Sequence, residues 1–235
     1  EVATTNTYAI HRDRLRAAGI EHRFAELHAQ ALAEARAARD THGRGRIAGS
    51  LGPLVASYRP EVHPAFEDAV PRYAEVAGLL GPQVDLILCE TVASLAHADA
   101  VLAGAQAARR PVWLAVTVED RDGTRLRSGE PVADLARVLR GRAAAVLANC
   151  SAPEAMAAAL TALAPLGLLC QRLQAHHRGF PEGPPHCRCA GSTPGHDARP
   201  LRPPRGGLGG AGRDDHRRLL RDDAGAYRRR GSRIA

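Results

Sequence analysis

The chain has 235 residues and a formal net charge of +7, and every one of its 32 lysine-or-arginine positions is arginine. The charge comes from residues 169–235, which hold 14 arginines and 6 acidic residues, whereas residues 1–168 hold 18 arginines and 19 acidic residues. A nearly neutral body argues against a nucleic-acid-binding surface on the folded part. No apolar run approaches the ~20 residues that a membrane helix needs, so we expect no membrane partner either.

The cysteine content favours a reducing compartment. The five cysteines are odd in number and are not spaced like the disulfide framework of a secreted domain, so a cytoplasmic protein is expected. The length allows one α/β domain or two small ones. A change near Leu168 decides which part can fold, because apolar periodicity ends there and Gly, Pro and Arg dominate the remainder.

Short apolar segments alternate with longer, alanine-rich amphipathic segments along residues 1–168. Continuous apolar strands that alternate with helices are typical of a parallel sheet covered on both faces. Pro153 and Glu154 suit the start of the last helix, with Ser151 as its predicted N-cap. The predicted strands are Val2–Thr5, Arg46–Ser50, Asp85–Cys89, Val112–Thr117 and Ala144–Ala148, and the predicted helices cover about 21–40, 66–80, 94–108, 131–139 and 153–163.

The strands recur at intervals that fit βα units, about 30–40 residues each. A (β/α)₈ barrel and a doubly wound sheet both remain possible at this point. In either architecture the chemistry lies at the carboxyl ends of the strands.

A polar segment follows each predicted strand directly. Most of these segments have an ordinary explanation as turns, caps or loops, and Cys89 is expected to be a small buried apolar residue. Glu90 is harder to explain, because a carboxylate at the end of a buried strand needs a partner or a role. One cysteine alone does not make a zinc site, which uses about three protein ligands. The segments are Thr4–Tyr8, Gly49–Pro53, Cys89–Thr91, Thr117–Glu119 and Asn149–Ser151.

In this order the segments resemble the homocysteine S-methyltransferase family, which includes betaine-, S-methylmethionine- and cobalamin-dependent enzymes. The resemblance covers about residues 1–168 and implies an α/β fold, an incomplete (β/α)₈ TIM barrel with strands 2–6 present. The family's first strand is expected to be missing, because Glu1 falls at the second strand. Strands 7 and 8 are expected to be missing or scrambled. The resemblance rests on Thr4-Thr5-Asn6-Thr7-Tyr8, Gly49-Ser50-Leu51-Gly52-Pro53, Glu90-Thr91 and Asn149-Cys150.

The resemblance also implies an activity and a site. Family members bind zinc through three cysteines, and the zinc-bound thiolate of homocysteine takes a methyl group from a small donor to give methionine. Cys150 matches the first zinc ligand. Glu90 would hold the homocysteine amino group, Thr5 and Asn149 would line the pocket, and Ser50 would shape the strand-end loop. The other two ligands belong to a Gly-Gly-Cys-Cys motif, which this chain lacks.

The missing motif can be written in another reading frame of the tail. With GC-biased codons and a shift of one nucleotide, Gly212–Arg221 can give Gly-Ala-Thr-Ile-Ile-Gly-Gly-Cys-Cys-Glu. The same shift can turn Leu169–Leu173 into Tyr-Ala-Asn-Gly-Phe and His176–Phe180 into Ile-Thr-Glu-Gly-Phe. Three family-like strings in one frame and in the right order support the hypothesis of a frameshift at about Leu168.

Two functions of different class therefore remain. The intact gene would encode a zinc-dependent methyltransferase. The chain as written would instead be a catalytically inactive, truncated barrel with a basic tail over residues 169–235. That tail is expected to be disordered, because its composition leaves too little apolar surface to offset chain entropy. Unpaired strand edges and exposed apolar faces would favour non-specific self-association.

The frameshift hypothesis makes a prediction about the gene. We expect the coding DNA near codons 160–175 to contain a gained or lost nucleotide relative to the frame that encodes the family motif. Sequencing the gene measures this directly. In-frame codons for Gly212–Arg221 that give no Gly-Gly-Cys-Cys when shifted would contradict the hypothesis.

Overall fold

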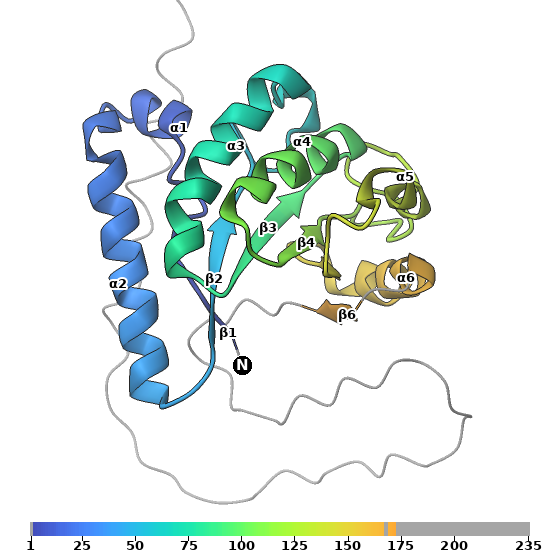
Figure 1. The fold of residues 1–235 in the computed structure, drawn as a ribbon. Helices are drawn as coiled ribbons and strands as arrows, with labels where there is room; N and C mark the ends of the chain where they lie inside the picture. The colour runs from blue at the N-terminus through green and yellow to red at the C-terminus, as the bar shows by residue number, and fades with distance from the viewer. Residues whose placement is uncertain (1, 167–168, 173–235) are drawn as a thin grey trace, which may run out of the picture. The chain divides into compact units, whose positions relative to one another are not determined.

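A computed structural model describes residues 2–166 and 169–172, with side chains described for residues 2–166 (Figure 1). The predicted disordered tail over residues 169–235 therefore lies outside the described residues, apart from the strand that opens it. Within the described part, helices and strands alternate along the chain, as the sequence predicts for βα units.

Six parallel strands form one sheet in the order β1-β2-β3-β4-β5-β6, so each strand pairs with the next strand in sequence. A doubly wound sheet reverses its strand order at a switch point, and this sheet does not. The sequential order is that of a barrel wall, and it brings all the carboxyl ends to one edge. The strands are β1 Val2–Thr4, β2 Arg46–Leu51, β3 Leu86–Val92, β4 Val112–Val116, β5 Ala145–Ala148 and β6 Leu169–Arg172.

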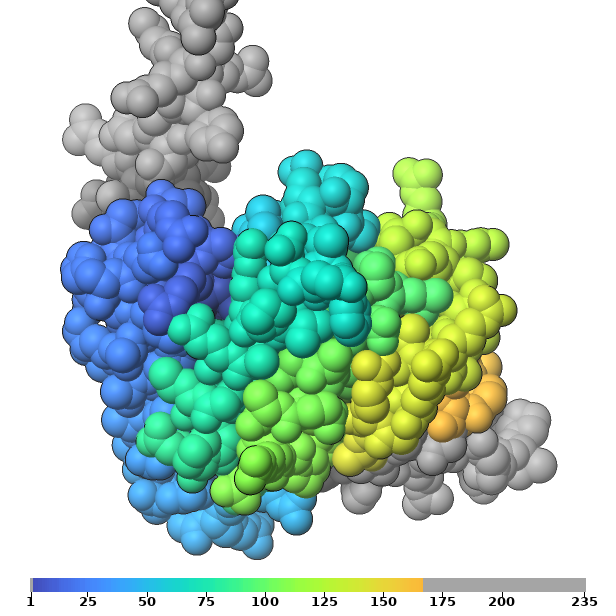
Figure 2. Space-filling view, turned by 45° about the horizontal axis from the view of Figure 1, so that its top comes forward, coloured from blue at the N-terminus to red at the C-terminus, as the bar shows by residue number. Residues whose placement is uncertain are grey.

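Successive segments of the chain follow one another across the face shown in Figure 2, from blue through green to yellow. None of the helices in the described residues is long and apolar enough to cross a bilayer. The α-helices are α1 Arg12–Ala17, α2 Phe24–His42, α3 Phe66–Leu80, α4 Leu95–Ala105, α5 Ala136–Leu139 and α6 Pro153–Leu163. Short 3₁₀ helices cover Glu21–Arg23, Pro60–Val62, Gly81–Gln83, Gln106–Ala108, Val132–Leu135 and Ala164–Leu166.

Local sequence accounts for several helix ends. Gly43 ends α2 in the left-handed conformation (φ 81°), which glycine adopts without a Cβ clash. Ser94 caps α4, and its side chain accepts a hydrogen bond from the backbone N–H of His97. The prediction that Ser151 caps α6 is wrong. The N-cap is Ala152, which has no capping side chain, because the Ser151 hydroxyl binds elsewhere.

Both faces of the sheet are buried, as expected for a parallel sheet. On the helix side, strand residues such as Ile87, Leu114 and Val146 pack with the helices in the main apolar cluster. Alternate residues, including Leu88 and Leu147, form a second buried cluster on the opposite face. Side chains at the strand ends therefore sort between these two faces by the same alternation.

The structure departs from the predicted elements in three places. The sheet has six strands rather than five, because Leu166–Cys170 is still an apolar run of strand length and β6 pairs with the free edge of β5. The short helix α1 was not predicted. The strand β3 continues past Cys89 to Val92, with a register shift against β4 between those two residues.

Gly104 controls how closely α4 approaches α3. A Cβ at Gly104 would lie 2.4 Å from Cβ of Tyr73 and 2.9 Å from the carbonyl oxygen of Val70. We expect Gly104→Ala to lower the free energy of unfolding by about 1–3 kcal/mol, because the helices must move apart. A Cβ at Gly78, in α3, would meet no atom within 4 Å outside its own turn of helix, so Gly78→Ala should raise stability by about 0.5–1 kcal/mol. Urea denaturation measures both, and equal effects would contradict the packing argument.

Candidate functional site at the carboxyl edge of the sheet

Strand alternation places two of the expected site residues on the same face. Leu86 and Leu88 of β3 and Leu147 of β5 belong to the cluster on the side of the sheet away from the helices. Because side chains alternate along a strand, Glu90 and Asn149 come to that side, each two residues after one of these leucines. The carboxyl ends of neighbouring strands therefore present polar groups above an apolar layer.

Thr5, Ser50 and Glu90 form one hydrogen-bonded group across β1, β2 and β3. The Ser50 hydroxyl donates to Oε1 of Glu90. The Ser50 backbone N–H donates to Oγ1 of Thr5 at 3.0 Å. Oγ1 of Thr5 lies 2.8 Å from Oγ1 of Thr7, which in turn donates to the Ser50 carbonyl oxygen at 2.7 Å. Three of the five expected site residues are thus brought together.

Glu90 sits in an environment that disfavours its charge. Burial raises the pKa of the Glu90 carboxyl, and the hydrogen bond from Ser50 offsets part of that rise. Within residues 2–166 this carboxylate accepts no other side-chain hydrogen bond. A half-desolvated carboxylate at a strand end is suited to accept a positively charged or hydrogen-bond-donating group of a ligand.

Thr91, Asn149 and Cys150 form a second group, which joins β3 to β5 over the end of β4. The Thr91 backbone N–H donates to Oδ1 of Asn149 at 3.2 Å, and Nδ2 of Asn149 lies 3.4 Å from Oγ1 of Thr91. The Thr91 hydroxyl donates to Sγ of Cys150 at 3.5 Å. Since Glu90 and Thr91 are adjacent, the two groups meet in β3, and all five expected residues lie at this edge.

Three residues around Cys150 have left-handed backbone conformations. The φ angles are 59° at Thr91, 51° at Cys150 and 61° at Tyr58. A left-handed conformation is uncommon for residues other than glycine, and for a β-branched residue such as threonine it is a true outlier. Such conformations cost of order 1–3 kcal/mol each and cluster at functional sites. Their concentration here marks the turn around Cys150 as a functional candidate.

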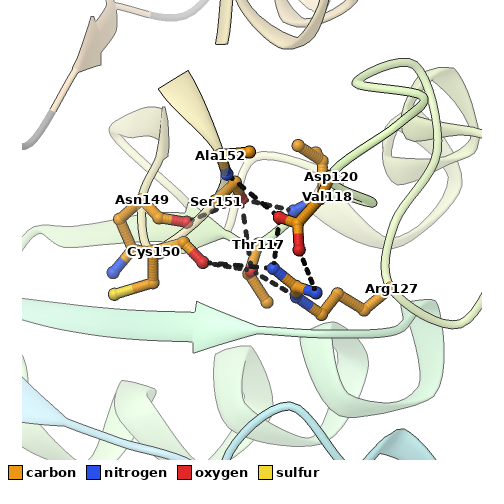
Figure 3. A network of polar contacts seen from close by, with 8 residues as sticks. All are labelled: Thr117, Val118, Asp120, Arg127, Asn149, Cys150, Ser151 and Ala152. Carbon is orange, nitrogen blue, oxygen red and sulfur yellow. Dashed lines mark hydrogen bonds and ion pairs between the residues drawn. The ribbon is translucent and has the colours of Figure 1, made fainter. Parts of the chain in front are cut away.

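The backbone of the Cys150 turn is held by residues of the loop after β4. The Thr117 hydroxyl donates to the Cys150 carbonyl oxygen at 3.0 Å. Arg127 donates to Oγ1 of Thr117 at 3.1 Å and to both carboxylate oxygens of Asp120, at 2.7 and 3.2 Å. Asp120 also accepts the backbone N–H of Ala152 at 3.0 Å. Figure 3 shows Arg127 and Asp120 facing the turn from one side.

Ser151 connects the same turn to the segment that follows β4. Its Oγ accepts the backbone N–H of Val118 at 2.9 Å and donates to the Asn149 carbonyl oxygen at 3.0 Å (Figure 3). These bonds explain why Ser151 does not cap α6. They also fix the backbone conformation of Asn149 and Ser151, the residues on either side of Cys150.

Tyr58, in the loop after β2, lies beside the Cys150 thiol. Partial burial, together with the nearby Cys150 thiol, raises the pKa of Tyr58 to about 12, although the side chain as a whole is 46% exposed. The guanidinium carbon of Arg127 lies 5.1 Å from the centre of the Tyr58 ring, a cation–π distance. The loops after β2 and β4 thus meet next to Cys150.

The two described cysteines differ in environment. Cys150 is exposed, whereas Cys89 is fully buried in the main apolar cluster. Burial, and to a lesser degree the charge of Glu90, raises the pKa of the Cys89 thiol far above its usual range. The expectation that Cys89 is a buried structural residue agrees with this environment, and only Cys150 presents a thiol at the site.

The described residues do not by themselves fit a zinc ion. Within residues 2–166, no group of three His, Cys, Asp or Glu side chains is placed to hold one metal ion. A zinc site uses about three protein ligands. Cys150 offers one sulfur of the right type, and its neighbour Thr91 offers a hydroxyl, which is not a ligand that zinc prefers.

Several site residues were not among the predicted ones. Thr117 and Ser151 lay in the polar strand-end segments, but their residue types suggested ordinary turns and caps. Arg127, Asp120 and Tyr58 lie in loops, and no spacing in the sequence connects them with Cys150. Only the fold brings these loops together.

A model of the homocysteine S-methyltransferase family matches residues 1–185. The chain belongs to this family. The match extends beyond Leu168, where the sequence change was placed, and the additional stretch includes β6. A comparison with curated protein sequences found no match.

Two solved structures of a bacterial relative are similar to this one. The metallated form of the homocysteine methyltransferase MmuM from Escherichia coli is 25% identical with a TM-score of 0.59, and the match covers 73% of this chain and 66% of that one. The apo form of the same protein is 27% identical with a TM-score of 0.51, covering 70% and 62%. The chain thus spans about two thirds of the length of MmuM.

We expect Glu90→Gln to stabilise the fold at neutral and alkaline pH. Burial raises the pKa of Glu90 in the folded state, so its stability contribution is complete below the unfolded value of 4.5 and is lost as the pH rises through the folded value. Glutamine carries no such dependence and can still accept the Ser50 hydroxyl. Urea denaturation from about pH 4 to about pH 8 should show a growing advantage of Glu90→Gln over the parent chain.

Glu34→Gln is the matched control, because Glu34 is exposed on α2. Its stability difference from the parent should not grow with pH. A Glu90→Gln chain that is less stable than the parent at the upper pH would contradict the assignment of Glu90 as a carboxylate whose charge is disfavoured by burial.

Proposed function

We propose that the chain is the main part of a homocysteine S-methyltransferase, which transfers a methyl group from a small donor to the sulfur of homocysteine and gives methionine. The observation that supports this most is the joining of the two hydrogen-bonded groups at Glu90 and Thr91, within a family match over residues 1–185. The reaction is proposed for the cytoplasm, on the cysteine pattern described above.

The proposed architecture is an incomplete (β/α)₈ barrel. The sequential, parallel order of the strands supports it. If β1 takes the place of the family's second strand, β6 takes the place of the seventh rather than leaving it empty. Every expected site residue then lies at the carboxyl end of a barrel strand, where barrel enzymes carry their chemistry.

Homocysteine is the proposed ligand of the strand-end edge. Its ammonium group suits the Glu90 carboxylate, because a positive charge within about 4–6 Å would offset the burial that raises the pKa of that group. Ser50 then orients the carboxylate, and Thr5 fixes the Ser50 backbone. Asn149 is proposed to line the pocket and to hold Thr91 in its left-handed conformation.

Cys150 is proposed as the residue that faces the homocysteine sulfur. The Thr91 hydroxyl and the Tyr58 phenol approach its thiol, and the Arg127 network fixes its backbone. Zinc remains a proposal from the family resemblance and requires ligands beyond residues 2–166, so no reaction step is assigned to it.

A second candidate is a catalytically inactive domain of this family. The observation that favours it is the single thiol at the site, with no three-ligand group within residues 2–166. On this view the chain keeps the substrate-binding half of the site and lacks the remainder of the metal site.

Methionine formation separates the two candidates. The assay contains L-homocysteine, zinc and either S-methylmethionine or betaine. We expect negligible turnover by the chain as written and robust turnover by a full-length, frame-restored version. Cys150→Ala in that version should lower turnover by more than about a hundredfold, since even outer partners of a metal ligand contribute about 10–100-fold.

The matched control is Cys89→Ala in the same full-length version, because the Cys89 thiol is buried in the main apolar cluster and does not present itself at the site. Robust, zinc-dependent turnover by the chain as written would contradict the inactive candidate. Equal activity of Cys150→Ala and its frame-restored parent would remove Cys150 from the proposed site.

A further inference from the structure

Three ring side chains, from α3, from α4 and from the loop before α3, form a hydrogen-bonded chain. His63 lies in the loop before α3, Tyr73 lies on α3 and His97 lies on α4. Nε2 of His63 and Nε2 of His97 each lie 3.0 Å from the Tyr73 hydroxyl oxygen. The two imidazole rings stack with centroids 4.4 Å apart. Tyr73 and His97 are buried, and His63 is half-buried.

The backbone contacts fix the direction of the hydrogen bonds. Nδ1 of His97 accepts the backbone N–H of Ala93 at 3.3 Å, so the proton of the neutral ring lies on Nε2 and is donated to Tyr73. The Tyr73 oxygen also accepts the backbone N–H of Leu54 at 3.3 Å. Both of its lone pairs are then used, so its own proton goes to Nε2 of His63.

The two amide donors belong to the loops that carry the site. Leu54 follows β2 and lies between Ser50 and Tyr58 in sequence, and Ala93 follows β3 two residues after Thr91. One phenol oxygen therefore holds the loop after β2 directly and the loop after β3 through His97. Neither loop is held by a regular strand pairing at these amides.

We propose that the His63–Tyr73–His97 chain is a proton-sensitive clamp on the loops after β2 and β3, and that Tyr73 is a positioning residue for the proposed site. The clamp acts through Leu54 and Ala93 and makes no contact with substrate. Its relevance to catalysis rests on the proposed function, whereas its existence does not.

Protonation of His63 would break the clamp, because the hydrogen-bond donors around the Tyr73 hydroxyl would then outnumber its acceptor sites. A second proton on His63 turns Nε2 from an acceptor into a donor. Three N–H donors, from His63, His97 and Leu54, would then face two lone pairs on Tyr73, whose own proton would lose its acceptor. The charged ring would also stack on His97. At least one hydrogen bond to Tyr73 must break, and the Leu54 and Ala93 amides are then no longer held through Tyr73 and His97.

The surroundings of the clamp offer little compensation for a positive charge. His11 meets the Tyr73 ring edge-on at 5.9 Å, and Cys89 is buried nearby. Asp13 and Arg14, from α1, have opposite effects on the pKa of Tyr73: Asp13 raises it and Arg14 lowers it. Burial lowers the pKa of His63, and a backbone hydrogen bond to Pro64 offsets part of that lowering.

Burial supports the direction of the pH response. It lowers the pKa of His63, and it lowers the pKa of His97 well below 6.5, with smaller effects from His63 and His11. A histidine whose folded-state pKa is depressed contributes stability above the unfolded value of 6.5, and that stability is lost as the pH falls through the folded value. The clamp should therefore open on the acid side of 6.5.

Amide hydrogen exchange of the chain as written tests the clamp without any substrate. Protection factors, corrected for intrinsic exchange, are compared between about pH 7.5 and about pH 5. We expect the Leu54 and Ala93 amides to lose about tenfold protection at the lower pH, with α2 amides unchanged as the internal reference. Because α2 carries the buried His28, the amides of α6, which has no histidine, serve as a second reference. Loss of protection in both α2 and α6 to the same extent would mean global unfolding and would overturn the proposal.

Two variants separate positioning from general stability. Tyr73→Phe should lower protection of both loop amides about tenfold at the upper pH and remove the pH response. His63→Gln keeps a neutral acceptor for Tyr73, so it should retain protection at the upper pH and lose the response. If Tyr73→Phe does not fold, His63→Gln decides alone, and a response equal to the parent's overturns the proposal.

His28→Gln is the matched control. His28 is also buried with a lowered pKa, but it lies on α2 and contacts the Phe24 carbonyl instead of the clamp. It should leave the pH response of the loop amides unchanged. Loss of the response in His28→Gln would assign the effect to acid destabilisation in general and would overturn the clamp. Failure of the methyltransferase assay would leave all these exchange results unaffected.

Discussion

The site depends on a local break in β3 at Thr91. In a regular strand, Glu90 and Thr91 would face opposite sides of the sheet. The left-handed conformation of Thr91 and the register shift between Cys89 and Val92 allow both side chains to contribute to the site at the carboxyl edge of the sheet. Bulges of this kind are found next to active sites, where they re-aim a side chain.

The break is maintained by bonds from neighbouring strands. Asn149 accepts the Thr91 N–H, and without this bond the amide would be buried without a partner. Cys150 is left-handed too, and Thr117, Ser151 and the Arg127–Asp120 pair hold its flanking backbone. Strain in one strand is thus offset by polar contacts from the next two. Such an arrangement favours a fixed site over a maximally stable fold.

Much of the fold follows from patterns within single segments. The five predicted strands lie within a few residues of β1 to β5, because apolar runs bounded by polar turns carry that information locally. Thr5, Ser50, Glu90, Asn149 and Cys150 could be placed at one edge, because parallel strands bring their carboxyl ends together. The family resemblance supplied their expected roles.

The remaining features depend on distances that no local pattern encodes. Arg127 reaches the Cys150 turn from a loop of irregular course, and Tyr58 reaches it from another. The left-handed angle at Thr91 is opposed by the preference of threonine itself, so only tertiary contacts explain it. The strand β6 was missed because the composition changes within it: Leu169 and Cys170 continue the apolar run, whereas Gln171 and Arg172 are polar.

The close contact between Gly104 and Tyr73 has a consequence for how this family member tolerates change. Tyr73 carries its hydroxyl at the far end of a rigid ring with two side-chain torsions, so a displacement at its Cβ is transmitted to the oxygen almost undiminished. Gly104 bears no functional group, yet its contact fixes the position of the Tyr73 Cβ. A substitution where α3 packs against α4 would therefore shift the Tyr73 hydroxyl and the Leu54 amide that it binds, even when every polar residue of the site is retained.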